Sequence, residues 1–149
     1  MTGIRIVPLG GTHLPHVAQI EKRSFSAPWS QTSLELLLTG ENGGFAALDG
    51  DCVIGYIGYL GVIDEYEITN VAVDPDFRRQ GIGAALVGAL LERARESDIL
   101  RVTLDVRPSN SPAIALYQAF GFTPCGTRKN FYSHPREDAT VMELLTNKQ

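Results

Sequence analysis

The sequence has few of the residues that hold small or metal-dependent folds together. Its 149 residues include two cysteines, three histidines and one tryptophan. Cys52 and Cys125 form neither a CxxC pair nor a metal-ligand cluster, so we interpret both as reduced thiols that pack within the protein. The histidines have no metal-ligand spacing, and we expect no metal site and only surface or packing roles for them; they are His13, His16 and His134.

Long hydrophobic runs and an excess of positive charge are missing too. No stretch approaches the roughly 20 apolar residues of a membrane span, and residues 1–5 lack the features of a signal peptide, so we expect a cytoplasmic protein without membrane contact. A net charge of −4 argues against direct nucleic-acid binding and favours a basic partner. The 44% hydrophobic content is typical of a globular chain, and we expect one domain over residues 1–149. The oligomeric state is not predicted.

Hydrophobic periodicity predicts an α/β fold. The expected order is β-α-α-β-β-β-α-β-α-β-β, with a mixed sheet between helical layers. The expected strands cover residues 4–7, 45–48, 52–62, 66–73, 100–106, 122–128 and 139–145, and the helices cover 12–25, 33–38, 81–97 and 111–120. Residues 49–51 read Asp-Gly-Asp, which indicates a hairpin turn between two of these strands.

The most informative segment joins the strand that ends at Val73 to the helix that begins near Gly81. The intervening turn is basic and carries glycines at 81 and 83, which let a ligand approach the backbone closely. The first amides of a helix lack intrahelical acceptors and lie at its positive end. The segment therefore predicts a pyrophosphate site. A dinucleotide fold would instead require GxGxxG followed by an acidic residue.

Four blocks in fixed order carry a family resemblance: residues 70–75, the motif Arg78-x-x-Gly81-x-Gly83, residues 105–110 and residues 115–122. They resemble the GNAT acetyltransferase superfamily, whose acetyl-CoA signature is Gln or Arg, two residues, Gly, one residue, and Gly or Ala. The resemblance implies a three-layer α/β/α fold with a mixed, centrally splayed β-sheet. It also implies acetyl-CoA as cosubstrate and direct acetyl transfer to an amine in a ternary complex.

Further pieces resemble the RimI group of this superfamily, namely Pro28-Trp29-Ser30, residues 64–68 and residues 128–132. The group acetylates the N-terminal alanine of small-subunit ribosomal protein eighteen, so the resemblance implies that such an N-terminus is the partner. Another protein N-terminus, a lysine or a small amine would use the same cosubstrate. A CoA-binding module without turnover is the alternative from another class.

The resemblance also assigns the cosubstrate to one strand, the turn after it and the following helix starts. The pantetheine arm would bind along the strand, and backbone amides of the turn would bind the pyrophosphate. The implied cofactor-binding residues are Val71, Ala72, Val73, Arg78, Arg79, Gln80, Gly81, Ile82, Gly83, Ala84, Asn110 and Tyr117.

Two proton-transfer roles follow from the same resemblance. Tyr117 matches the general acid that protonates the departing thiolate. Asp105 is the candidate general base, although RimI proteins typically carry the longer Glu there. A water relay from Asp105, or Glu67 on the neighbouring strand, is the alternative. The acceptor peptide would contact Phe25, Trp29, Glu65 and Tyr132.

Overall fold

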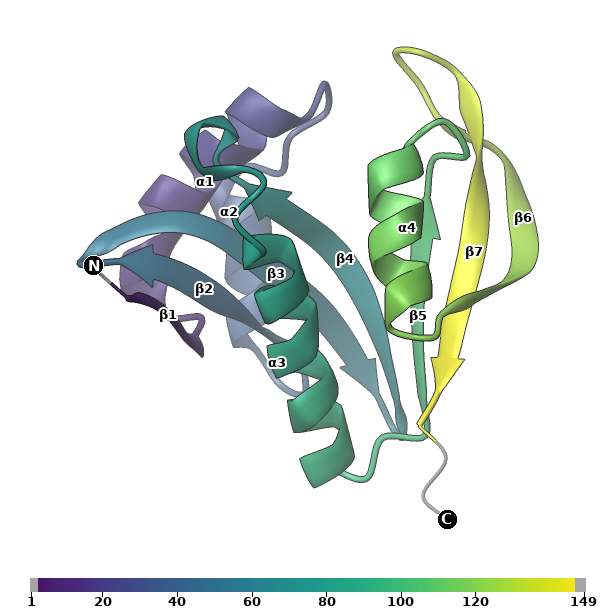
Figure 1. The fold of residues 1–149 in the computed structure, drawn as a ribbon, viewed down its shortest axis with the longest axis horizontal. Coiled ribbons are helices and arrows are strands. Elements are labelled where there is room, and N and C mark those ends of the chain that lie inside the picture. The colour runs from purple at the N-terminus through teal and green to yellow at the C-terminus, as the bar shows by residue number, and fades with distance from the viewer. Residues whose placement is uncertain (1–2, 147–149) are drawn as a thin grey trace.

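The computed structural model describes residues 3–146, which fold into a seven-stranded sheet flanked by helices (Figure 1). The strands are β1 (Ile4–Pro8), β2 (Gly43–Asp49), β3 (Cys52–Val62), β4 (Glu65–Val73), β5 (Arg101–Val106), β6 (Thr123–Tyr132) and β7 (Glu137–Leu145). The helices are α1 (Leu14–Ser24), α2 (Gln31–Leu34), α3 (Ile82–Glu96) and α4 (Ser111–Ala119). The predicted order of strands and helices is confirmed.

The sheet consists of two antiparallel halves joined by one parallel pair. Its strand order is β1-β2-β3-β4-β5-β7-β6, and only β4 and β5 run parallel. Their pairing extends from Glu65↔Arg101 to Ile68↔Leu104, whereas β4 continues to Val73. The two strands therefore diverge along their second halves, as Figure 1 shows. This divergence is the central splay that the resemblance implied.

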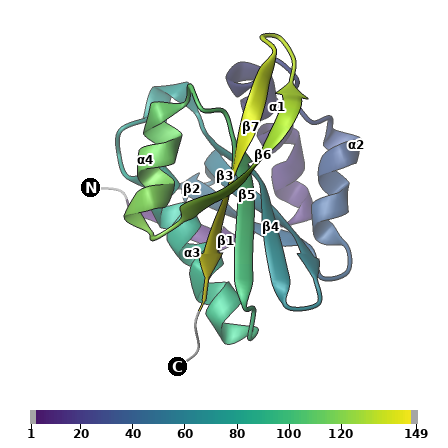
Figure 2. The same ribbon diagram turned by 90° about the vertical axis from the view of Figure 1, so that its right-hand side faces the viewer.

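Helices cover both faces of the first half of the sheet (Figures 1 and 2). On one face, α3 and α4 share a core that includes Leu86, Leu90 and Tyr117. On the other face, α1 and α2 pack over a second core that includes Val17 and Leu34. Among the described residues, the main sheet contacts of α1 are with β3 and β4, so the second face is most open beyond β4, over β5 and β7. The polar side chains of β5 lie on this open face.

The alternation of β5 shows which side chains face which way. Val102, Leu104 and Val106 are buried, whereas Thr103 and Asp105 between them are partly exposed. Successive side chains of a strand point to opposite faces. Because Leu104 and Val106 belong to the core under α3 and α4, Asp105 points to the open face.

The prediction that the cysteines pack inside the protein is wrong, since Cys52 and Cys125 are both exposed free thiols. Cys52 is the first residue of β3, directly after the hairpin turn, and is the exposed residue before a buried run. Cys125 lies on the edge strand β6, where the register shifts between Pro124 and Gly126. Strand β6 also extends to Tyr132, beyond its predicted end at residue 128.

Candidate functional site

The splay leaves one edge of β4 unpaired. Beyond Ile68 no residue of β4 pairs with β5, while Val71 and Val73 remain paired with β3 on their other side. The register with β3 shifts at Thr69, which adds one residue to β4 at the point of divergence. Such a bulge bends a strand and increases its twist. The backbone of residues 69–73 thus forms a strand edge to which an extended ligand arm can add.

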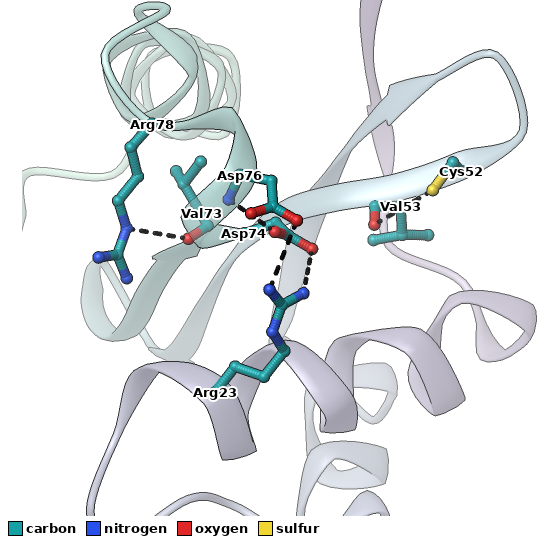
Figure 3. A network of polar contacts seen from close by, with 7 residues as sticks. All are labelled: Arg23, Cys52, Val53, Val73, Asp74, Asp76 and Arg78. Atoms are coloured by element: carbon teal, nitrogen blue, oxygen red, sulfur yellow. Dashed lines mark hydrogen bonds and ion pairs between the residues drawn. The ribbon is translucent and has the colours of Figure 1, made fainter.

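Polar contacts from two sides fix the turn that follows β4 (Figure 3). The Asp74 carboxylate accepts a hydrogen bond from Asp76 N at 2.9 Å and forms an ion pair with Arg23 of α1, also at 2.9 Å. Arg23 Nη2 lies 3.6 Å from the Asp76 carboxylate. The Arg78 Nε donates to the Val73 carbonyl oxygen at 3.4 Å. The turn is therefore held against both α1 and the end of β4.

The start of α3 has the geometry of an anion cradle. Arg79 and Gly81 have positive φ angles of 67° and 75°, so the chain curls before the helix begins. Gly81 is the N-cap and supplies no side-chain cap, which leaves the first helical amides without intrahelical acceptors. A Cβ at Gly81 would meet nothing within 4 Å, so the space beside this residue is open. The side chain of Ile82 is buried in the core, and only its main chain can take part.

Tyr117 lies on α4 with its ring buried beside Phe122, the ring centroids being 5.8 Å apart. Burial raises the pKa of Tyr117 to about 12, and the neighbouring Tyr132 adds to the rise. Its phenol therefore stays protonated at neutral pH and can donate a proton. Asn110, a predicted cofactor-binding residue, caps α4: its side-chain oxygen accepts a hydrogen bond from Ala113 N at 3.2 Å. It therefore has a structural role at the helix start.

Asp105 forms an ion pair with Arg128 of β6, a partner that lies 23 positions away in the sequence. Its Oδ1 accepts a hydrogen bond from Arg128 Nε of β6 at 3.0 Å, and its side chain is only 13% exposed. The hydrogen bond to Asp105 raises the pKa of Arg128. Burial raises the pKa of Tyr132, and the nearby Asp105 carboxylate raises it further. Tyr132 thus interacts electrostatically with both Asp105 and Tyr117.

The two glutamates of β4 lie nearer the other end of the strand. Glu67 is aligned with Thr103 of β5 and lies in a shallow surface pocket that Arg128 also lines. Glu65 forms an ion pair with Arg101 Nη1 at 3.2 Å. It is separated from Val73 by about 26 Å of extended strand. Glu65 therefore lies at the far end of β4 from Val73, whereas Arg128, which pairs with Asp105, lines the same pocket as Glu67.

Apart from Glu65 on β4, the predicted acceptor residues come from two separate segments. Phe25 follows α1 and is 39% exposed, and Trp29 is half-buried against the core under α1. Tyr132 packs against Phe131, with centroids 5.0 Å apart, and the Arg107 guanidinium lies 4.3 Å above its ring centroid. Tyr132 is next to the proton-transfer candidates, and the other two belong to the α1–α2 loop, residues 25–30.

A network around Glu137 fixes the loop between β5 and α4, and none of its contacts was predicted. Glu137 Oε1 accepts from Arg107 Nη1 at 3.1 Å, and its Oε2 accepts from Ser109 N at 2.9 Å. Desolvation raises the pKa of Glu137, but the hydrogen bonds from Arg107 and Ser109 outweigh it and hold the pKa below its ordinary value. The network ties the start of α4, and with it Tyr117, to β7.

Within residues 3–146, no group of three or more His, Cys, Asp or Glu side chains is placed to hold a metal ion. No helix in this described part of the chain is long and apolar enough to cross a membrane.

Known proteins similar in sequence and fold to this chain are acetyltransferases, as the site geometry indicates. Residues 14–122 match the model of the acetyltransferase (GNAT) family. A putative [ribosomal protein bS18]-alanine N-acetyltransferase of Bacillus subtilis is 38% identical over 90% of each chain. The Escherichia coli K12 [ribosomal protein bS18]-alanine N-acetyltransferase is 37% identical, over 93% of this chain and 95% of its own. The crystal structure of the ribosomal-protein-S18-alanine N-acetyltransferase from E. coli superposes with a TM-score of 0.91 at 34% identity, covering 99% of this chain and 96% of the other.

The family match spans most of the chain and includes the splay, the anion cradle and Tyr117. The relatives are similar over nearly their whole lengths, so the likeness is not confined to a cofactor motif. This chain is therefore an acetyl-CoA-dependent N-acetyltransferase and belongs to the GNAT family.

Proposed function

We propose that this chain transfers the acetyl group of acetyl-CoA to the α-amine of the N-terminal alanine of ribosomal protein bS18, and that residues 1–149 act as one domain. The observation that carries the proposal is similarity of 37–38% identity, over at least 90% of the chain, to proteins named for that activity. A ribosomal protein is made in the cytoplasm, where we propose that the enzyme acts.

In this proposal acetyl-CoA binds along the unpaired edge of β4. The pantetheine amides would pair with the backbone of Val71 and Val73 on the edge that faces β5, where β4 has no partner strand. The pyrophosphate would bind the amides of residues 81–84, with positive charge from Arg78 or Arg79. The acetyl thioester would then lie in the splay near Tyr117, and a backbone amide at or near Val73 would donate to the developing oxyanion.

The transfer needs no acyl-enzyme. The neutral amine attacks the thioester carbonyl carbon, the carbonyl π electrons move to oxygen, and a tetrahedral intermediate forms. As the intermediate collapses, the C–S bond breaks and Tyr117 gives its proton to the departing sulfur. The amine loses one proton to a base, so free CoA and the acetylated amine are the products.

The proton from the amine requires only a modest base. An N-terminal α-amine has an ordinary pKa near 8, so about a tenth of it is already neutral at pH 7. Asp105 is our first choice, either directly or through a water molecule, because its carboxylate interacts with Tyr132, which in turn interacts with Tyr117. Glu67 is the alternative. The role of Glu65 in acceptor binding stays a prediction.

The experiment uses purified protein, acetyl-CoA and a peptide with the first ten residues of mature bS18. Mass spectrometry and release of free CoA are followed together. We expect one acetyl group on the α-amine and none on a matched peptide whose α-amine is blocked but which carries a free lysine. Acetylation of the blocked peptide, or CoA binding without transfer to either peptide, would contradict the proposal. The thiol assay needs an enzyme blank because both cysteines are exposed.

A further inference from the structure

One buried carboxylate is not used by the reaction described above. Glu21 on α1 is 0% exposed and is the one charged side chain among residues 3–146 that is fully buried. The core between α1, α2 and the sheet is otherwise apolar and includes Val17 and Leu34. Burying a carboxylate costs free energy unless hydrogen bonds compensate, so the partners of Glu21 indicate what it does.

Three donors from three elements converge on this carboxylate. The Trp29 backbone N–H donates to Oε1 at 2.8 Å, and the Asn70 Nδ2 donates to Oε2 at 2.8 Å. The Tyr56 hydroxyl donates to Oε2 in a short hydrogen bond. Burial raises the pKa of Tyr56 and the Glu21 carboxylate raises it further, so this hydroxyl keeps the proton that it donates. Glu21 thus joins the 25–30 loop, β3 and β4.

The groups held by Glu21 lie where the acceptor is proposed to bind. Trp29 belongs to the 25–30 loop, and Asn70 directly precedes Val71 on the part of β4 that β5 does not pair. A single side chain therefore fixes the loop relative to the splayed strand. No hydrogen bond from Glu21 reaches the anion cradle at residues 79–84.

The same junction holds polar atoms that the fold leaves without partners. Among the described residues, the buried oxygens Ser24 Oγ, Thr69 Oγ1 and Asn70 Oδ1 accept or donate no hydrogen bond. Ser24 lies one turn after Glu21 on α1, and Thr69 is the bulged residue next to Asn70. Native proteins leave few such atoms, and each requires an explanation. These atoms lie at the end of α1 and at the bulge of β4. The junction thus gives up some hydrogen-bond stabilisation, which agrees with a role in fixing the relative positions of the two elements.

We infer that Glu21 is a positioning residue for acceptor binding: it fixes the 25–30 loop against β4 and so sets the shape of the acceptor side of the splay. The identity of the acceptor rests on the proposed function, whereas the link between Glu21 and the loop does not. Loss of the carboxylate should weaken peptide binding and leave acetyl-CoA binding nearly unchanged.

The test compares Glu21→Gln with Tyr56→Phe, which removes one donor. Tyr59→Phe is the matched control, because it removes a buried hydroxyl from the same strand in the core on the opposite face. Steady-state kinetics give KM for the peptide and for acetyl-CoA separately. We expect Glu21→Gln to raise the peptide KM about tenfold or more, since an amide cannot accept all three hydrogen bonds, and to change the acetyl-CoA KM less than about threefold. Tyr56→Phe should raise the peptide KM less, and Tyr59→Phe should not.

A second readout does not depend on catalysis. Trp29 is the only tryptophan in the chain, so fluorescence excited selectively at tryptophan reports on the 25–30 loop alone. Acrylamide quenching of Trp29 should increase in Glu21→Gln and Tyr56→Phe, but not in Tyr59→Phe. Unchanged quenching, or equal rises in both KM values, would overturn the inference. If the wild-type protein does not acetylate the peptide, the proposed function fails, while quenching still decides the role of Glu21. If Glu21→Gln does not fold, Tyr56→Phe decides it.

Discussion

At the scale of single residues, burial has its clearest chemical effect on Tyr117. Its pKa of about 12 lies above the ordinary tyrosine value of about 10, so the phenol keeps its proton further into the alkaline range. We expect Tyr117→Phe to lower kcat about 100-fold or more, with little change in the acetyl-CoA KM. In the wild-type protein, loss of this proton should not reduce kcat below about pH 11. A fall of kcat near pH 10 that disappears in Tyr117→Phe would contradict the raised pKa of Tyr117, and an unchanged kcat in Tyr117→Phe would contradict its role as the acid.

Asp105 and Glu67 can be distinguished by the pH at which each matters. A base is needed most when the amine is protonated, because a neutral amine has already lost the proton. We expect Asp105→Asn to lower kcat/KM about tenfold or more at pH 7 and by a smaller factor at pH 9. Glu67→Gln should leave both values close to wild type. A larger loss in Glu67→Gln than in Asp105→Asn would transfer the role to Glu67.

Sequence patterns predicted the positions of the candidate residues better than their partners. Asp105 and Tyr117 stand within recognisable blocks, and in the structure each interacts with Tyr132. The ion pair between Asp105 and Arg128 joins residues 23 positions apart, and Glu21 reaches Asn70 across 49 positions. Such pairs depend on strand register and helix packing, which local periodicity does not contain. For the same reason the exposure of the cysteines was predicted wrongly.

At the scale of elements, the turn before α3 depends on its left-handed residues. Gly81→Ala places a Cβ at a φ of 75°, which costs about 1 kcal/mol, and shifts the amides proposed to bind pyrophosphate. We expect the acetyl-CoA KM to rise about tenfold.

Gly40→Ala is the matched control for this variant. Gly40 also has a positive φ, of 57°, and a Cβ there would likewise meet nothing within 4 Å. It should lower Tm by a similar amount without changing the acetyl-CoA KM. Equal KM changes in the two variants would show that backbone strain, not the cradle, is responsible.

The elements themselves were predictable because most of them bury one regular face. Leu86, Leu90 and Ala94 of α3 recur every four residues, and all three are 0% exposed. Strand β6 is different, because nearly all its residues are exposed and its register shifts twice. Its sequence therefore lacks the alternation that marks a half-buried strand, and its length was underestimated.

At the scale of the whole molecule, two antiparallel half-sheets are joined by the short parallel pairing of β4 and β5. A ligand that binds the folded state stabilises it by mass action, by about 2.7 kcal/mol at 100 times its Kd. We expect CoA to raise Tm and to slow amide hydrogen exchange most strongly in residues 69–73. The Tyr117→Phe variant should respond in the same way. Protection spread evenly over both half-sheets would argue against binding along β4.

The splay between β4 and β5 has a consequence for the amount of enzyme in a cell. A protein whose sheet is completed by its own cosubstrate is more open to proteases when that cosubstrate is scarce, because degradation follows the population of opened states. Prolonged depletion of the CoA pool would then shorten the lifetime of the enzyme as well as stop its turnover. When the pool recovered, acetylation capacity would return only as fast as new protein was made.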